Sequence, residues 1–266
     1  MLYFVSTPIG NLKDVTYRAI EVLNMVDEIG CEDTRHSLTF LNYYNIKKPL
    51  FSYHKFNERE VTEKIINKLK EGKNIAIISD AGMPVISDPG NILSERLVKE
   101  GIEFTVLPGA NAALSALVLS GMDASRFTFV GFLPEKKTER EDLIGKYKNV
   151  LSTLIFYSAP HDVKKDIETL YSVLGDRNAS AVKEITKLHE NVDRFNLKDG
   201  LSKEPKGEYV LIVEGAKEGQ ENAHLSDEEL IDKYVLSGLS KKDAIKKVAR
   251  ERDIPKSELY KYTIGK

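Results

Sequence analysis

Residues 74–90 read NIAIISDAGMPVISDPG, and this stretch decides the fold class. Its apolar run, IAII, is typical of a strand that is covered on both faces of a parallel sheet. The glycine, proline and aspartate residues that follow favour a loop, because these residue types form turns. A helix is expected from about Asn91, and it should end at Gly101. A strand, a loop and a helix in this order form one repeating unit of an α/β protein.

The same unit recurs along the first 120 residues. Helical periodicity separates the strands, and Asp14 is expected to cap a helix that carries Ala19 and Val22 on one face. A further, Ala-rich helix is expected at residues 110–119. Strands are expected at residues 2–5, 28–31, 50–53, 74–79 and 104–107. We therefore expect residues 1–120 to form an N-terminal α/β domain with a largely parallel sheet.

The pattern changes after residue 120. A second α/β domain is expected at residues 121–222, ending in a polar linker at 217–222. Residues 226–266 are expected to form a helical, helix-turn-helix-like tail, with Ser240 and Asp243 forming a capping box and Pro255 breaking the helix. In the second domain, the expected strands are 127–132, 153–157, 180–186 and 209–213, and the expected helices are 139–147 and 163–174.

Charge and composition limit the classes of function. The 266 residues include 39 Lys and Arg and 41 Asp and Glu, a net charge of −2, which excludes nucleic-acid binding by bulk charge. The charge is uneven, because residues 237–266 carry a net +5 and the rest a net −7. The single cysteine, Cys31, excludes an intrachain disulfide and favours a reducing, cytoplasmic location. No apolar run approaches the ~18 residues of a membrane span, so no membrane association is expected.

Several familiar site motifs are missing. No G-x-G occurs, which excludes the Rossmann dinucleotide fingerprint, and there is no P-loop. The five histidines lack metal-ligand spacing, so no metal is expected. Four polar loops instead follow strands, at residues 6–11, 32–35, 79–90 and 107–112. One such loop would be an ordinary turn, but four at one sheet edge favour a ligand crevice.

A family resemblance rests on motifs along nearly the whole chain. They are TPIGNL (7–12), CEDTR (31–35), SDAGMPVISDPG (79–90), LPGANAAL (107–114), GFLP (131–134), LIFYSAPH (154–161), KEITKLHE (183–190) and KGEYVLIVEG (206–215). With these motifs the chain resembles the tetrapyrrole-methylase-fold enzymes, and most closely the ribosomal RNA small subunit methyltransferase I family. Cys31 departs from the family pattern, which usually has Ala there, and we interpret it as a packing residue.

The resemblance implies a fold, a reaction and partners. The fold is a two-domain, class III methyltransferase fold with a small helical C-terminal extension, usually as a homodimer. The reaction is transfer of a methyl group from S-adenosyl-L-methionine to the ribose 2′-oxygen of a cytidine in the decoding centre of 16S rRNA. The substrate is the rRNA within the small ribosomal subunit, and the cofactor lies in the cleft between the domains.

The resemblance also implies cofactor-binding residues. Asp80, at a strand end, is the leading candidate, because its carboxylate can accept from the ribose hydroxyls or the amino group of the cofactor. Its alternative role is a turn or a helix cap, and that of Met83 is core packing. The full expected set is Asp80, Ala81, Gly82, Met83, Pro84, Asn111, Ala112, Tyr157, Ser158, Glu208 and Tyr209.

Catalysis needs a proton acceptor, because a ribose hydroxyl is a weak acid. The expected catalytic residues are Glu32, Asp33, Arg35 and Lys187, and the base stays open among Glu32, Asp33 and Glu184. The alternative for residues 32–35 is a helix cap with an ion pair, and for residues 187–190 a solvated strand edge.

RNA contacts are expected in two places. Tyr53, His54 and Asn57 resemble a family segment at the rim of the cleft and suit a splayed base, although His54 could equally be a surface histidine. The tail would add phosphate contacts through Lys241, Lys242, Lys246, Lys247, Arg250 and Arg252.

Two other functions remain open from the sequence. A small-molecule methylase of the same fold would not require the basic tail. A DNA-binding, ligand-sensing regulator would use the tail as a helix-turn-helix, but it would leave the four loops without a role.

Overall fold

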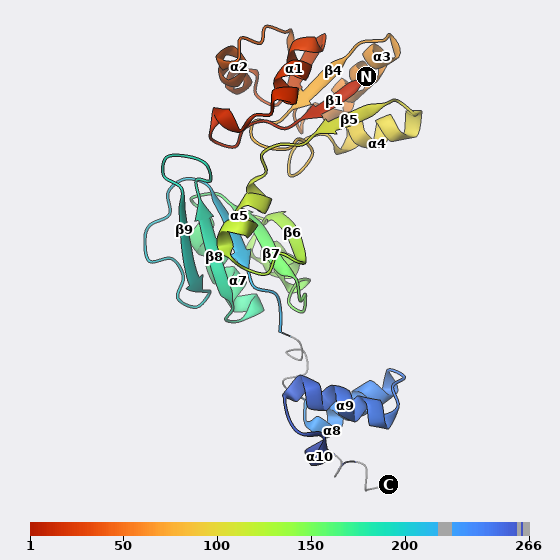
Figure 1. Ribbon diagram of the computed structural model, residues 1–266, viewed down its shortest axis with the longest axis vertical. Coiled ribbons are helices and arrows are strands. Elements are labelled where there is room, and N and C mark those ends of the chain that lie inside the picture. Colours follow the sequence, from red (N-terminus) through yellow and green to blue (C-terminus); the bar gives the residue numbers. More distant parts are fainter. Residues whose placement is uncertain (218–224, 260–261, 263–266) are drawn as a thin grey trace.

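The computed structural model describes residues 1–217, 225–259 and 262, and in this part of the chain it contains two sheets and a separate helical segment (Figure 1). The first sheet is wholly parallel, in the order β3-β2-β4-β1-β5. Its strands are β1 (Leu2–Val5), β2 (Glu28–Cys31), β3 (Leu50–Ser52), β4 (Ile75–Ile78) and β5 (Phe104–Leu107). The expected parallel sheet is thus confirmed, and all five strands end at the same edge.

Helices cover both faces of the first sheet. A short 3-10 helix, η1 (Leu12–Asp14), and the helices α1 (Tyr17–Met25), α2 (Thr34–Tyr43), α3 (Glu58–Lys70) and α4 (Asn91–Glu100) connect the strands. Side chains of α1 and α2 pack in one apolar cluster with β1 and β2 residues. Side chains of α3 and α4 pack in another, which includes Leu2, Ile75 and Ile77. The four residues of β4 are all buried, as the IAII run predicts.

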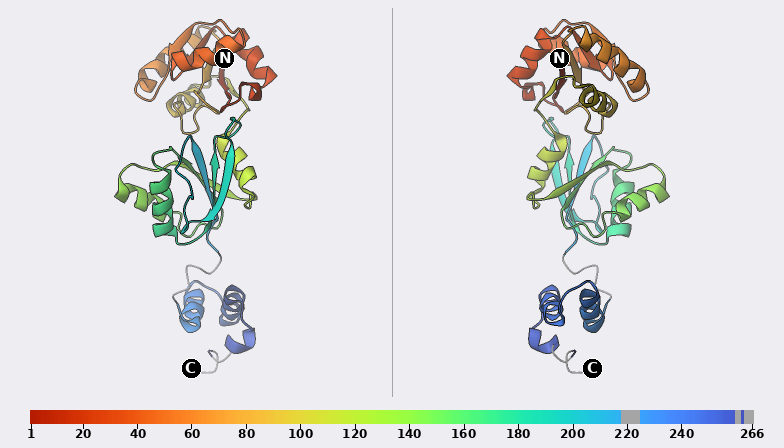
Figure 2. Two further views of the ribbon diagram at one scale, coloured as in Figure 1. Left: turned by 90° about the vertical axis from the view of Figure 1, so that its left-hand side faces the viewer. Right: turned by 90° about the vertical axis from the view of Figure 1, so that its right-hand side faces the viewer.

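The second sheet is mixed, in the order β6-β7-β10-β8-β9. Only β6 and β7 are parallel; β7, β10, β8 and β9 pair antiparallel. Its elements are β6 (Phe127–Phe132), α6 (Lys137–Gly145), β7 (Thr153–Ser158), α7 (Val163–Leu174), β8 (Asn178–Lys183), β9 (Asn191–Asn196) and β10 (Tyr209–Val213). Figure 2 shows this unit beside the carboxyl edge of the first sheet.

Helix α5 (Ala112–Ser120) packs on the second sheet, although its place in the sequence put it in the N-terminal unit. Ala113, Ala116 and Leu117 lie in one buried cluster with residues of β7, β8 and β10. Arg194 on β9 donates through Nε to the Ser120 carbonyl at 3.0 Å, near the end of the helix. Packing therefore places the change of unit before Ala112 and not at residue 120.

Three local expectations differ from the structure. Thr16, not Asp14, caps α1, because its hydroxyl accepts from the Ala19 N–H at 3.1 Å, while Asp14 ends the 3-10 helix. Strand β9 was not predicted, because its sequence NVDRFN is largely polar, as suits the edge of a sheet. Strand β8 ends at Lys183, and residues 184–186 continue as a loop instead of a strand.

The tail has a small core of its own. Helices α8 (Asp227–Leu236), α9 (Lys241–Arg252) and α10 (Lys256–Leu259) bury Leu230, Ile245, Val248 and Leu259 together. Ser240 accepts from the Asp243 N–H at 3.2 Å, so α9 begins where its sequence predicts. Residues 218–222 of the expected linker and residues 260–261 and 263–266 of the tail lie outside the described residues. Among the helices of the described part of the chain, none is long and apolar enough to cross a membrane.

Candidate functional site

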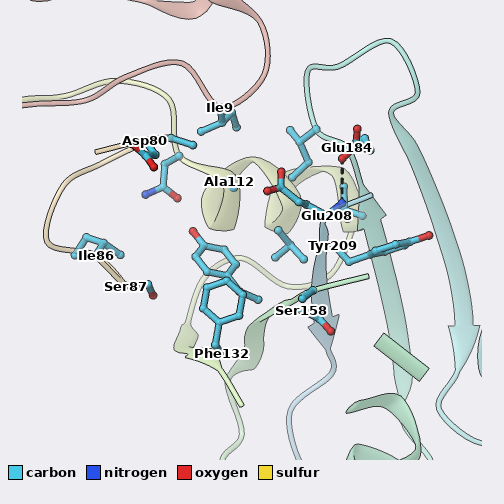
Figure 3. Close-up of a pocket in the computed structure, with 18 of the residues that line it drawn as sticks. Ile9, Asp80, Ile86, Ser87, Ala112, Phe132, Ser158, Glu184, Glu208 and Tyr209 are labelled. Atoms are coloured by element: carbon cyan, nitrogen blue, oxygen red, sulfur yellow. Dashed lines mark hydrogen bonds between the residues drawn. The ribbon is translucent and has the colours of Figure 1, made fainter. Parts of the chain in front are cut away.

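A pocket of about 370 Å³ lies where the carboxyl edge of the first sheet faces the second unit (Figure 3). Ligands of open α/β sheets bind beyond the carboxyl ends of the strands, which is where the first unit contributes its loops. The lining residues are Ile9, Asp80, Ala81, Gly82, Met83, Ile86, Ser87, Asp88, Asn111, Ala112, Phe132, Tyr157, Ser158, Ala159, Pro160, Val182, Glu184, Ile185, Lys187, Glu208, Tyr209 and Val210.

Two loops of the first sheet are tied together at the pocket floor. Thr7 and Gly82 exchange backbone hydrogen bonds of 2.8 and 3.1 Å, and the Ser79 hydroxyl donates to the Gly82 carbonyl at 2.8 Å. Gly82 has φ +84°, and a Cβ there would lie 3.2 Å from Ile9 Cγ2. The backbone at this point therefore needs glycine, which leaves it open to a ligand.

The loop after Gly82 is held in an uncommon conformation. Val85 and Ser87 have φ of 76° and 66°, which costs about 1–3 kcal/mol per residue and persists only where the surroundings enforce it. Buried Glu58 supplies an anchor, because its Oε1 accepts from the N–H groups of Gly90 at 2.8 Å and Ile92 at 3.1 Å. The strained part of the loop lines the pocket with Ile86 and Ser87 (Figure 3).

Carboxyl groups gather on this side of the pocket. Burial, reinforced by the negative charges of Glu32 and Asp80, raises the pKa of Asp88 to about 7. Burial and the charge of Asp80 also raise the pKa of Glu32, and His54 partly offsets this. A site with this much negative charge fits a cationic ligand group.

A charged cluster forms the opposite wall. Lys187 Nζ donates to Glu184 at 3.1 Å and to Glu208 at 2.7 Å, and the Glu208 N–H donates to Glu184 at 3.0 Å. The backbone hydrogen bond from Glu208 is the largest cause of the lowered pKa of Glu184. Burial lowers the pKa of Lys187, but the hydrogen bonds that it donates to Glu208 and Glu184 outweigh this effect and leave the pKa raised. Lys187 is therefore a fixed cation and not a proton acceptor.

The second unit adds an aromatic and a polar wall. The rings of Phe132 and Tyr157 lie 5.3 Å apart, and both line the pocket. The Ser158 hydroxyl donates to buried Asp166 at 2.6 Å, and Asp166 in turn lies 3.6 Å from Arg140. Arg140 also donates to the Pro134 carbonyl at 2.9 Å. The buried pair thus fixes the loops after β6 and β7.

Most of the sequence-predicted residues come together here. Those that line the pocket are Asp80, Ala81, Gly82, Met83, Asn111, Ala112, Tyr157, Ser158, Lys187, Glu208 and Tyr209. Asn111 also caps α5 by accepting from the Leu114 N–H at 3.0 Å. Asp88 also lines the pocket; it lies in the SDPG motif at residues 87–90 but is not among the predicted site residues.

Four predicted residues do not line the pocket. Pro84 is buried beneath the loop, and Glu32, Asp33 and Arg35 lie beside the pocket. Asp33 caps α2 by accepting from the Arg35 N–H at 2.8 Å, and its own N–H donates to Asp80 at 3.3 Å. The Arg35 side chain is 93% exposed. The helix-cap interpretation therefore describes Asp33 best.

The rim segment also needs correction. Tyr53 is 2% exposed and its hydroxyl donates to Glu58, so its ring cannot stack on a base. Asn57 is occupied within the loop, because it accepts from the His54 N–H and donates to the Ser52 carbonyl. Phe56, 95% exposed, is the aromatic ring that this segment presents to solvent.

Comparison with known proteins agrees with this arrangement. Residues 1–199 match the family model of the Tetrapyrrole (Corrin/Porphyrin) Methylases. The fold is similar to the crystal structure of diphthine synthase, with a TM-score of 0.65 at 14% identity over 81% of this chain and 90% of that one. It is also similar to the crystal structure of uroporphyrin-III-C-methyltransferase from Thermus thermophilus, with a TM-score of 0.54 at 19% identity over 80% of this chain and 93% of that one.

Fold and pocket thus define an S-adenosyl-L-methionine-dependent methyltransferase of the tetrapyrrole methylase class. Two curated relatives, from Halalkalibacterium halodurans and Bacillus subtilis, are each named Ribosomal RNA small subunit methyltransferase I. Each is 42% identical, over 97% and 98% of this chain and 93% and 92% of theirs. The chain belongs to the ribosomal RNA small subunit methyltransferase I family. This membership argues against the small-molecule methylase and the DNA-binding regulator.

Proposed function

We propose that this protein methylates the ribose 2′-oxygen of a cytidine in the decoding centre of 16S rRNA, within the small ribosomal subunit in the cytoplasm. The observation that carries the proposal is the pocket between the two sheets. Motifs from both halves of the chain line this one pocket. The relatives that share these motifs along the whole chain are named for small-subunit rRNA.

The residues at the pocket fit the cofactor. Asp80 offers a carboxylate for its ribose hydroxyls or amino group, and the glycine at position 82 leaves space that a Cβ would fill. The apolar surface of Val182, Val210 and Tyr157 suits the adenine ring. The cofactor supplies an activated methyl group, so the protein mainly has to orient the reactants and accept a proton.

The RNA is assigned to the outer surface of the pocket and to the tail. Phe56 and Arg35 are exposed near the carboxyl edge of the first sheet and suit an unstacked base and a phosphate. The basic residues of 237–266 would add phosphate contacts to a chain whose other 236 residues carry a net −7. We further propose that the protein acts as a homodimer, as members of this family usually do.

Mass-spectrometric mapping tests the function directly. Small subunits from cells that lack this enzyme are incubated with the protein and labelled S-adenosyl-L-methionine, and the modified nucleotide is located. A single 2′-O-methylcytidine in the decoding centre is the expected product. A methyl group on a base, or no transfer to small subunits, would overturn the proposal.

A further inference from the structure

We propose that Asp88 is the general base that accepts the proton of the methylated hydroxyl. This inference rests on the proposed function and adds to it the residue that removes the proton. It places the base on the loop after β4, and not among Glu32, Asp33 and Glu184, where the sequence had left it open.

The pocket itself narrows the choice. Among the described residues, four carboxylates line the pocket. Glu184 and Glu208 are held by Lys187, and Asp80 accepts a hydrogen bond from the Asp33 N–H. The Asp88 carboxylate has no hydrogen-bond or ion-pair partner within the part of the chain that the structure describes. A proton acceptor must keep a lone pair available, so Asp88 is the group equipped for this task.

The surrounding loop holds Asp88 in place. It lies between Ser87, at φ 66°, and Gly90, whose N–H is bonded to buried Glu58. A Cβ at Gly131 would lie 3.3 Å from Ser87 Oγ, so the second unit closes against this loop. Fixed on both sides, an unpaired carboxylate at a pocket wall is the kind of strained arrangement found at active sites.

The charges around Asp88 suit the role. Asp80 lies on the same loop, and Glu32 after β2 and Tyr157 on β7 are the titratable groups that act on it from other elements. Burial, together with the negative charges of Glu32 and Asp80, raises the pKa of Asp88 to about 7. A base works best when its pKa lies near the working pH, because it is then both ionised and basic. Glu184 has a lowered pKa and would be a weaker acceptor.

The step balances with the groups named. The hydroxyl proton passes to the Asp88 carboxylate as the ribose oxygen forms its bond to the methyl carbon. The carbon–sulfur bond breaks, and its electron pair stays on sulfur and gives neutral S-adenosylhomocysteine. One positive charge on sulfur and one negative charge on Asp88 disappear together.

The test compares Asp88→Asn with the parent and with Asp142→Asn, an exposed aspartate on α6. We expect Asp88→Asn to lower the single-turnover rate on small subunits by about 100- to 10,000-fold. The parent's kcat/KM should rise with pH through about 7 and then level, and this rise should disappear in the variant. Asp88→Glu should restore part of the rate together with the rise.

Two further measurements do not depend on turnover. Carbon NMR of the aspartate carboxyl groups in the free protein should show one that titrates near 7 and is missing from Asp88→Asn. Calorimetry should give S-adenosyl-L-methionine affinities within a few-fold of the parent. A slow variant that keeps the parent's pH profile, or one that has lost cofactor affinity, would overturn the assignment as a base.

The outcome is separable from that of the proposed function. If the parent methylates small subunits and Asp88→Asn does so equally fast, only the base is wrong. If the parent itself gives no 2′-O-methylcytidine, the proposed function fails, and the NMR titration still reports whether Asp88 is the proton-binding group of the pocket.

Discussion

Single residues divide the pocket into two electrostatic halves. On one side, Asp80 and Asp88 lie next to Glu32, and in the described part of the chain neither aspartate forms an ion pair. On the other, Lys187 balances Glu184 and Glu208. The unbalanced half is the natural place for a cationic cofactor, because a bound positive charge relieves repulsion between the carboxylates.

Asp80→Asn tests this half of the pocket. A hydrogen bond to a charged group contributes about 1.5–3 kcal/mol, so the loss of the charge should weaken S-adenosyl-L-methionine binding by roughly 10- to 100-fold. Isothermal calorimetry measures the change, with Asp142→Asn as the control. Unchanged affinity would remove Asp80 from the cofactor site.

The ionisation of Asp88 should also make the stability of the protein depend on pH. The Asp88 pKa of about 7 in the folded protein lies above the ordinary aspartate value of 3.8, so the folded state binds the extra proton between these pH values. The contribution of this group to the free energy of unfolding is therefore fully present below about pH 4, and it is lost as pH rises through 7.

Asp88→Asn removes that dependence. The variant should resist urea better than the parent at pH 8, and the difference should shrink as pH falls toward 4. Asp142→Asn should show no such trend. An equal difference at every pH would mean that the carboxyl group is not its source.

At the scale of elements, regular patterns were predictable and long-range packing was not. The bounds of β1, β2 and β5 follow from short apolar runs, and α4 from its Gly101 stop. The sheet on which α5 packs could not be predicted, because the helix AALSALVLS is apolar on most sides and could pack on either sheet. Edge strand β9 lacks the apolar alternation that marks a strand.

The predictions for the site fall into the same two groups: residues in local motifs were predictable, and side chains placed by long-range packing were not. Asp80, Gly82 and Asn111 were predictable, because they follow strands within specific motifs. The aromatic pattern of residues 53–57 identified the right segment, but burial chose Phe56 and not Tyr53 as the exposed ring. Side-chain direction in a loop depends on tertiary contacts, and Tyr53 packs in one buried cluster with Ile75 and Leu93, which lie far along the chain.

The segment after β3 yields a prediction at this scale. Base stacking on an aromatic ring contributes about 1–3 kcal/mol, so Phe56→Ala should raise the KM for small subunits by roughly 5- to 100-fold. Cofactor affinity should not change, because Phe56 does not line the pocket. Tyr171→Ala on α7, which removes another exposed ring, serves as the control. Equal KM values for Phe56→Ala and the parent would exclude this ring from RNA binding.

The whole molecule separates charge between its parts. Residues 1–236, which include the pocket, carry a net −7, and residues 237–266 of the tail carry +5. Phosphate groups would be repelled by the first and attracted by the second. An enzyme built this way should depend on its tail for RNA affinity and on the shape of the assembled subunit for correct placement.

Reversal of charge at the start of α9 tests this division in the full chain. Lys241 and Lys242 are exposed in the first turn of that helix, outside the small core of the tail. The double variant Lys241→Glu and Lys242→Glu should raise the KM for small subunits. It should also flatten the salt dependence of binding, by about 0.7–0.9 in the log–log slope for each phosphate that the tail no longer neutralises. Filter binding at several salt concentrations gives that slope.

The control places the same change of charge on the body, at exposed Lys136 and Lys137 at the start of α6. If total charge were all that mattered, both double variants would weaken binding equally. If the tail binds the phosphates, only the α9 variant should show the flatter slope, and cofactor affinity should stay unchanged in both. A normal KM and a normal slope for the α9 variant would leave the tail with a packing role, and the RNA would then have to be held by the exposed side chains near the pocket.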